Sequence, residues 1–404
     1  MNRLLVRDLA QAVTPAEDRA PVRGRDAMRA LDVVEDAYVL CEDGLIAAMG
    51  RMSDLGPLDG DVVEVDGRGH AAIPGLVDCH THAVFAGSRA GEFELRSGGA
   101  SYEELHAAGG GILSTVEATR AAGEEGLRAV LTEHRAWMLA CGTTTFEAKS
   151  GYGLDRETEL AMLRVVREAG GAPTWLGAHA VPPEFEDADA YLDFALAEVL
   201  PEAAQIAEMA DVFLERGAFD AAQARRYLEA CRDAGLRLRL HADQFTEGGG
   251  LPLAVELEAA SVDHLEATGP EGVLTVARSE VAAVLLPVAA LFLGRPMPPA
   301  RALVDEGAIV ALATDFNPGS AYCESLSVTC ALACTQMGLS PAEALVACTV
   351  NAAHVLGRAD RVGRLAPGFA ADVVLLDTSD WRDLAYHLGG NHVARVVHGG
   401  TLPA

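Results

Sequence analysis

The strongest constraint on the fold is the alternation of helical and strand-like segments through the middle of the chain. Helix-forming stretches at residues 124–140, 156–170 and 221–235 each run into a short apolar or β-prone segment. Alternation of this kind over roughly 300 residues predicts parallel βαβ units, which places the protein in the α/β class. So many repeats favour closure of the sheet, so we expect a (β/α)8 barrel of the TIM type rather than an open sheet.

The two ends of the chain differ from its middle. Near the N-terminus, β-prone segments flank Asp43 and Gly44, a dipeptide typical of a two-residue hairpin turn. Residues 363–377 and 392–400 return to the same strand-rich pattern. Because strands need partners, we expect both ends to form one small β-sandwich domain together. The predicted division is residues 1–68 and 363–404 for the β domain and residues 69–362 for the barrel.

Composition narrows the class of protein. No apolar run among the 404 residues approaches the roughly 20 residues of a membrane span, and the N-terminus has no apolar core typical of a secretory signal. The eight cysteines are scattered without a CxxC pair, which favours reduced thiols and a cytoplasmic protein. The net charge of −28 argues against nucleic acid and anionic membranes as partners. A small anionic ligand remains compatible with it, because a local arginine can override the global field.

Polar side chains follow several of the predicted strands. His80 and His82 come directly after the apolar run that ends at Asp78, and side chains two residues apart on a strand share a face. Residues at the carboxyl ends of barrel strands converge on one site, where three histidines and one aspartate would suit Zn²⁺ or Fe²⁺. The predicted metal ligands are His80, His82, His241 and Asp315, while His179 and His264, also at strand ends, remain for substrate and proton chemistry.

The motifs around these residues resemble a known family. PGLVDCHTH, the later strand-end histidines and a final strand-end aspartate together resemble the amidohydrolase superfamily. FAGSRAGEFELR, GGGILSTV, TTFEAKSGYGL, LGAHAVPPEF, LHADQF, DHLE and ATDFNPGS narrow the resemblance to the imidazolonepropionase family, over most of the chain. The resemblance implies one Zn²⁺ or Fe ion per subunit, a homodimer, and hydrolysis of 4-imidazolone-5-propanoate to N-formimino-L-glutamate in histidine degradation.

The resemblance also implies which residues contact this small anionic heterocycle. Arg89 would grip the propanoate carboxylate in a charge-assisted pair, which suits a guanidinium. Lys149 corresponds to a lysine that becomes a bridging carbamate in binuclear relatives, but we interpret it as a structural lysine behind a mononuclear site. The implied substrate-binding residues are Arg89, Tyr152, His179, Asn317, Gly319 and Ser320.

Gln244 is a departure from the resembled family, which commonly has a glutamate proposed to handle protons at this position. A carboxamide forms hydrogen bonds but accepts no proton at neutral pH. Gln244 is therefore expected to bind the substrate or the attacking water. The proton transfers then fall on His264, on Asp315 or on both, and these two are the predicted catalytic residues.

Two alternatives remain open. One is another cyclic amidohydrolase or a deaminase of the same superfamily, which Arg89 and the NPGS segment disfavour, since a neutral base needs no carboxylate clamp. The other is a non-catalytic barrel that binds a metal or ligand, and only Gln244 supports it. A turnover assay on metal-loaded protein distinguishes them.

Overall fold

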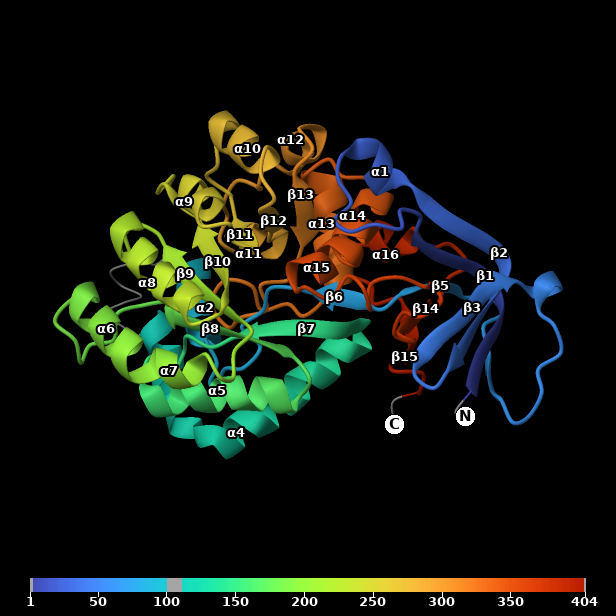
Figure 1. The fold of residues 1–404 in the computed structure, drawn as a ribbon, viewed down its shortest axis with the longest axis horizontal. Helices are drawn as coiled ribbons and strands as arrows, with labels where there is room; N and C mark the ends of the chain where they lie inside the picture. The colour runs from blue at the N-terminus through green and yellow to red at the C-terminus, as the bar shows by residue number, and fades with distance from the viewer. Residues whose placement is uncertain (1–2, 100–110, 403–404) are drawn as a thin grey trace.

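The protein is described by a computed structural model, which places residues 3–99 and 111–402. Its centre is an eight-stranded sheet of parallel strands in which each strand pairs with the next along the chain (Figure 1). The predicted barrel is therefore confirmed. Its strands are β6 (Leu76–Asp78), β7 (Thr143–Lys149), β8 (Ala172–Ala178), β9 (Met209–Leu214), β10 (Arg237–Ala242), β11 (Ser261–His264), β12 (Ala282–Leu285) and β13 (Ile309–Leu312).

The first and last barrel strands meet just beyond their carboxyl ends. The Asp315 amide donates to the His80 carbonyl at 3.0 Å, and the His82 amide donates to the Phe316 carbonyl at 3.0 Å. Thr81 and Phe316 form a parallel bridge between these bonds. The backbone that closes the barrel is thus the same backbone that carries three of the four predicted metal ligands.

Helices cover the outside of the barrel strands (Figure 1). Asp155 caps α5 by accepting from the Thr158 amide, and Asp220 and Ser340 form capping boxes at α8 and α14, which explains where these helices begin. No helix in the described ranges is both long and apolar enough to cross a bilayer. The helices are α1 (Arg25–Arg29), α2 (Ala90–Ser97), α4 (Ile112–Ala140), α5 (Arg156–Glu168), α6 (Ala188–Phe194), α7 (Leu200–Ala203), α8 (Ala221–Asp233), α9 (Gly250–Glu256), α10 (Pro270–Ala277), α11 (Pro287–Phe292), α12 (Ala300–Asp305), α13 (Leu326–Gln336), α14 (Pro341–Ala347), α15 (Val350–Val355) and α16 (Asp383–Tyr386), with a 3₁₀ turn at Met52–Asp54 and a π turn at Ala195–Val199.

Both ends of the chain build a second, seven-stranded sheet beside the barrel, as expected (Figure 1). Its hairpin turns at Asp43 and Gly44, which both have positive φ, the conformation that an Asp-Gly turn provides. Separate buried clusters fill the barrel and the small sheet. The exact domain boundaries stay a prediction. The strands of this sheet are β1 (Arg3–Pro15), β2 (Leu31–Glu42), β3 (Leu45–Arg51), β4 (Val63–Asp66), β5 (Ala71–Pro74), β14 (Val373–Leu376) and β15 (Val393–Val397).

Candidate metal centre and active site

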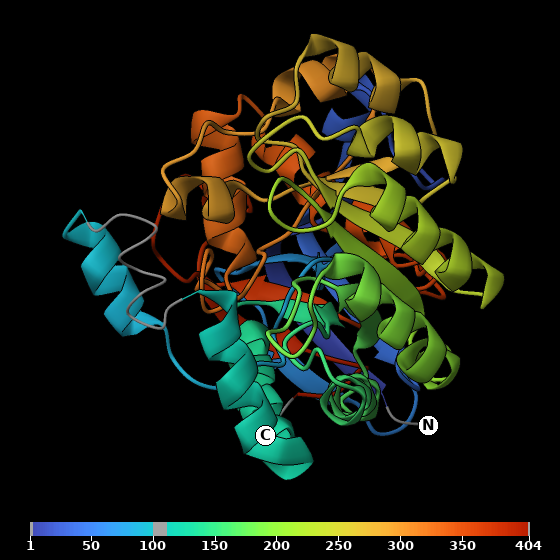
Figure 2. The ribbon, with the colours of Figure 1, turned by 90° about the vertical axis from the view of Figure 1, so that its left-hand side faces the viewer.

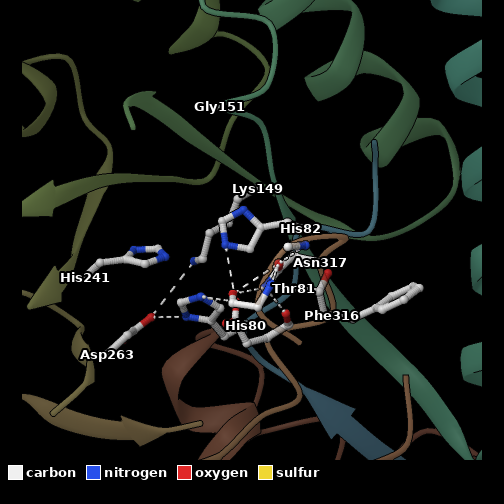
Figure 3. A network of polar contacts seen from close by, with 12 residues as sticks. His80, Thr81, His82, Lys149, Gly151, His241, Asp263, Phe316 and Asn317 are labelled. Carbon is white, nitrogen blue, oxygen red and sulfur yellow. Dashed lines mark hydrogen bonds and ion pairs between the residues drawn. The ribbon is translucent and has the colours of Figure 1, made fainter. Parts of the chain in front are cut away.

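The predicted metal ligands gather at the carboxyl ends of β6, β10 and β13 (Figure 3). His80 Nε2 lies 3.5 Å from Asp315 Oδ1, and His82 Nε2 lies 3.4 Å from the same oxygen. The His241 ring centre is 4.6 Å from that of His80 and 5.5 Å from that of His82. Since all four side chains are buried, the sequence prediction that they share one site agrees with their placement.

The atoms that face one another in this cluster are not satisfied by protein groups. His80 Nε2, His241 Nε2 and Asp315 Oδ1 are buried without a hydrogen-bond partner among the described residues. Their spacing forms two overlapping groups able to hold an ion, one of His80, His82 and Asp315 and one of His80, His241 and His264. Buried polar atoms rarely lack partners, so these donors fit a metal ion with N and O ligands.

Protonation distinguishes three histidines of the cluster from the fourth, His264. Burial lowers the pKa of His80, His82 and His241 below the usual value, so the three rings are neutral and can donate a lone pair. Burial also opposes the charge on His264, but Glu266, Asp315 and Asp263 outweigh it and raise the pKa of His264 to about 9. A protonated imidazole has no free lone pair, so His241 is a better ligand than His264.

Two carboxylates hydrogen-bond the rings of His80 and His241 on the side that faces away from the cluster. Asp263 Oδ2 accepts from His80 Nδ1 at 2.5 Å, and Asp211 Oδ1 accepts from His241 Nδ1 at 3.0 Å. Each bond fixes the tautomer that leaves Nε2 facing the cluster, as in many carboxylate–histidine–metal arrangements. The two aspartates thereby orient the rings and raise their basicity.

Lys149 lies beside the histidines of the cluster, and its Nζ is 4.0 Å from Asp263 Oδ2 (Figure 3). Its Nζ is 2.8 Å from Glu147 Oε1 and 2.9 Å from Asp211 Oδ2, and it is fully buried. Burial and Arg239 lower the pKa of Lys149, but Asp211, Glu147 and Asp263 outweigh them and raise it, so the group is an ammonium. Lys149 is the only lysine of the chain, although arginine is frequent, so this place favours a compact cation. The ion pairs agree with the structural role expected from the sequence.

Arg239 completes this buried network from the strand that carries His241. Its guanidinium donates to Asp263 Oδ2 at 2.6 Å and to the Cys79 carbonyl at 2.6 Å. It therefore links the carboxylate behind His80 to the strand end that precedes His80. The two cations balance the carboxylates that a barrel core could not otherwise bury.

His264 and Glu266 form a second pair at the edge of the cluster. His264 Nδ1 lies 3.2 Å from Glu266 Oε1, and His264 and Leu265 both have positive φ, an unusual conformation for such residues. Burial raises the pKa of Asp315 to about 7, and His264 opposes that rise. The site thus holds one cationic imidazole next to one carboxyl group whose negative charge is disfavoured by burial.

Tyr152 and His179 form a wall beside the cluster. The His179 ring stacks on His82 with centres 5.4 Å apart and lies 5.3 Å from Tyr152. His179 Nδ1 bonds the Gly151 carbonyl at 2.9 Å, and burial lowers the pKa of His179 to about 3, so the ring is neutral. Burial raises the pKa of the Tyr152 hydroxyl, which therefore keeps its proton. This wall thus offers two neutral hydrogen-bonding groups.

Arg89 lies at the first turn of α2, a helix that stands out from the barrel and has no buried residue (Figure 2). Its Nε and Nη2 donate to Glu92 at 2.9 and 2.5 Å, while Nη1 lies against Gly319. The charge of Arg89 also acts on the Tyr152 hydroxyl, which places Arg89 at the rim of the site. Because Glu92 occupies one edge of the guanidinium, a substrate carboxylate would bind the edge that carries Nη1.

The NPGS segment forms a turn whose polar groups mostly bond to each other. Asn317 Oδ1 accepts from the amides of Gly319 and Ser320 at 2.8 Å, and its amide nitrogen donates to the Asp315 carbonyl at 2.6 Å. Asn317 therefore shapes the turn after Asp315. Gln244 is also buried and forms no side-chain hydrogen bond with the residues that the structure describes, so its amide is free to meet a ligand.

Sequence reasoning missed the charged residues behind the ligands. Arg239 precedes His241 by two positions and Glu147 precedes Lys149 by two, so each pair shares one face of its strand. A charged residue at an inward position of a barrel strand was the available signal. The residues missed in this way are Glu147, Asp211, Arg239, Asp263 and Glu266, along with strand β9, which carries Asp211.

Residues 71–402 match the profile of the amidohydrolase family. The chain is 60% identical over 410 residues to an imidazolonepropionase of Rubrobacter xylanophilus, covering 99% of this chain and 98% of that protein. It is 46% identical to imidazolonepropionases of Chloroflexus aggregans and Deinococcus radiodurans, over 99% of this chain and 98% and 100% of those proteins.

Solved structures with the same fold include an adenosine deaminase from Xanthomonas campestris, described with bound zinc, and guanine deaminase from E. coli. The first has a TM-score of 0.73 at 20% identity and covers 99% of this chain and 92% of its own. The second has a TM-score of 0.72 at 14% identity and covers 100% and 99%. At these identities the likeness extends to the fold alone.

Proposed function

The chain belongs to the amidohydrolase family and, within it, to the imidazolonepropionases, and from this membership we propose that it hydrolyses the cyclic amide of 4-imidazolone-5-propanoate to N-formimino-L-glutamate in histidine degradation. One observation carries the proposal at the level of the site. A buried cluster of neutral histidines around Asp315 lies beside Tyr152, and the hydroxyl of Tyr152 also interacts with the charge of Arg89. Such a site pairs a hydrolytic centre with a place for an anionic group.

The proposed metal ligands are His80, His82, His241 and Asp315, with one Zn²⁺ or Fe ion per subunit. The unsatisfied Nε2 atoms of His80 and His241 and the unsatisfied Asp315 Oδ1 support this set, and His82 Nε2 lies 3.4 Å from the same oxygen. When bound, the ion supplies Lewis acidity that activates a water for attack on the ring carbonyl.

The remaining residues bind the substrate and move its protons. Arg89 holds the propanoate carboxylate through its Nη1 edge, and Gly319 leaves room for that guanidinium. Tyr152 and His179 hydrogen-bond the ring, while Gln244 and Ser320 orient the ring or the attacking water. Asn317 holds the turn that positions both Asp315 and Gly319.

Cationic His264 donates a hydrogen bond to the oxygen that becomes negative as the ring carbonyl is attacked. Asp315 takes the proton of the water and passes it to the ring nitrogen that leaves. The ring opens without a covalent bond to the protein, because water is the attacking group.

A turnover assay tests the function. Purified protein is loaded with Zn²⁺ or Fe²⁺ and incubated with 4-imidazolone-5-propanoate, and N-formimino-L-glutamate is identified by mass spectrometry. Guanine and a hydantoin serve as the comparison substrates. Turnover of only the imidazolone supports the proposal. Preferred turnover of guanine or the hydantoin would mean that the protein is a different cyclic amidohydrolase or a deaminase. Tight binding without turnover would mean that the protein binds its ligand without catalysis.

The identity of the metal and the assembly are tested on the same sample. Elemental analysis of protein purified without added metal distinguishes zinc from iron and gives the number of ions per chain. Light scattering tests the proposed homodimer, and cell fractionation tests the predicted cytoplasmic location.

A further inference from the structure

A second cavity lies at the foot of the barrel, between the barrel and the small sheet. Its volume is about 390 Å³, and its walls come from the end of α4, the start of β7, the segment after α15 and the turn after β15 (Figure 1). Thr144 lines it at one end of β7, while Lys149 stands below the metal cluster at the other end. The cavity is therefore separate from the proposed active site.

Two exposed arginines of this wall form no ion pair in the part of the chain that the structure describes. Arg135 and Arg361 line the cavity, and within residues 3–99 and 111–402 neither side chain forms a hydrogen bond or an ion pair. The chain has 59 acidic residues against 31 basic ones, so carboxylates to pair with them are abundant. Exposed arginines whose side chains have no partner among the described residues occur elsewhere in the chain, as at Arg395, but here two of them line one cavity together with Arg358, and this clustering favours a ligand that carries negative charge.

The other polar groups that line the cavity add to this excess of positive charge. Arg358 pairs through Nη2 with Glu208 at 2.7 Å, but its buried Nε has no partner among the described residues. The one carboxylate in the described wall, Asp372, accepts from His398 Nδ1 at 2.9 Å and from the Gly399 amide at 2.8 Å through the same oxygen, Oδ1. The wall thus carries three guanidinium groups against one carboxylate, an excess of positive charge.

We propose that this cavity binds a small organic anion with at least two charged oxygens, carried on a phosphate or on two carboxylates. Guanidinium groups match the planar pair of oxygens in either group. The volume is in the range of small-molecule sites, roughly 300–1,000 Å³, and exceeds that of a bare phosphate. Phe146 and Val362 in the same wall supply an apolar surface for the rest of the ligand.

Calorimetric titration of the metal-loaded full chain tests this site. The probes are inorganic phosphate and succinate, each at constant ionic strength set with chloride. The arginines are removed in the double variant Arg135→Met with Arg361→Met. The matched control is Arg395→Met, because Arg395 is exposed on β15 outside the cavity and has no recorded partner. Thermal unfolding and turnover without added anion confirm that each variant is folded.

The expected result is saturable binding of at least one probe, with affinity at least about tenfold weaker in the double variant and unchanged in the control. Tenfold corresponds to the loss of one charge-assisted contact of about 1.4 kcal/mol. Selective binding of phosphate or of succinate identifies the anionic group. Equal affinity in wild type and double variant would assign the anion to the active site, and either that result or the absence of binding by both probes overturns the proposal.

Discussion

Gly319 packs so closely against Arg89 that a Cβ atom on Gly319 would stand 2.1 Å from Arg89 Nη1. Moving Arg89 aside would break the bonds that its Nε and Nη2 atoms donate to Glu92. Two segments far apart in sequence thus fix the edge of the guanidinium that remains for a substrate. A glycine is needed in the NPGS turn because of this close contact, and not because of its own backbone conformation.

Gly319→Ala is therefore expected to displace Arg89 and weaken substrate binding. The loss of a charge-assisted contact of roughly 1.5–3 kcal/mol should raise KM about tenfold or more while kcat changes little. Steady-state kinetics measure this separation. Gly91→Ala is the control, since Gly91 lies in the adjacent helix α2 with open space around it. A normal KM in Gly319→Ala would remove Arg89 from the carboxylate site.

Glu266→Gln tests whether the charge on His264 is used in catalysis. Glu266 is a main cause of the raised pKa of His264, so removing its charge lowers that pKa. The imidazolium is present below its pKa and is lost as the pH rises through it. The alkaline limb of the kcat profile should consequently move to lower pH in Glu266→Gln. A limb that stays in place would show that another group controls it.

The barrel could be predicted because the alternation of helix and strand signals is visible in local sequence. Strand β9 was missed, also for a local reason. Its sequence, MADVFL, contains Asp211, and a charge in a short apolar run weakens the strand signal. That aspartate is buried because His241 and Lys149 satisfy it from other strands. A partner contributed by distant strands is not visible in a single segment.

The predicted site shows the same limit. Residues at strand ends could be grouped, because parallel strands bring their carboxyl ends together. The internal bonding of the NPGS turn and the pairing of Arg89 with Glu92 could not be read in the same way. Both depend on which rotamer a flexible polar side chain adopts, and the packing of the turn against α2 determines that rotamer.

Removing the ammonium at position 149 should destabilise the whole protein. In Lys149→Met, Glu147 and Asp211 lose their common counter-charge inside the barrel, which costs roughly 3–5 kcal/mol of unfolding free energy. Urea denaturation of the metal-free protein measures this loss. Since Lys149 is the only lysine, an amine reagent should modify this side chain only after unfolding. Rapid labelling of the Lys149 side chain itself in native protein, located by peptide mapping and distinguished from the N-terminal amine, would contradict its burial.

His241→Ala and His179→Ala separate a metal ligand from a substrate contact. Loss of His241 should remove metal and activity together, because one of the four donors is gone. His179→Ala should keep the metal, since His179 belongs to neither group of side chains spaced to hold an ion, and should mainly raise KM. Metal content by elemental analysis and kinetics on the same samples decide the assignment. Full metal occupancy in folded His241→Ala would exclude it as a ligand.

Gln244 tests whether the proton transfers need a carboxylate at this position. If they did, a natural glutamine there would leave the protein nearly inert, because loss of a general base typically costs about 10²–10⁴ in rate. We expect wild-type activity to be substantial, with His264 and Asp315 moving the protons and Gln244 only donating or accepting hydrogen bonds. Gln244→Glu should then change kcat modestly and chiefly add a limb on the acid side of the pH profile, since the new carboxylate acts only when ionised.

His264→Ala is the comparison for that variant and should cost far more, because it removes the donor to the developing oxyanion as well as a proton carrier. The three pH–rate profiles must be recorded at equal metal content, so that differences in occupancy do not enter. A gain of a hundredfold or more in Gln244→Glu would mean that the wild type lacks its base, which would favour the binding-protein alternative. A comparable rate in both proteins would place the base on Asp315, since the protonated His264 has no free lone pair to accept a proton.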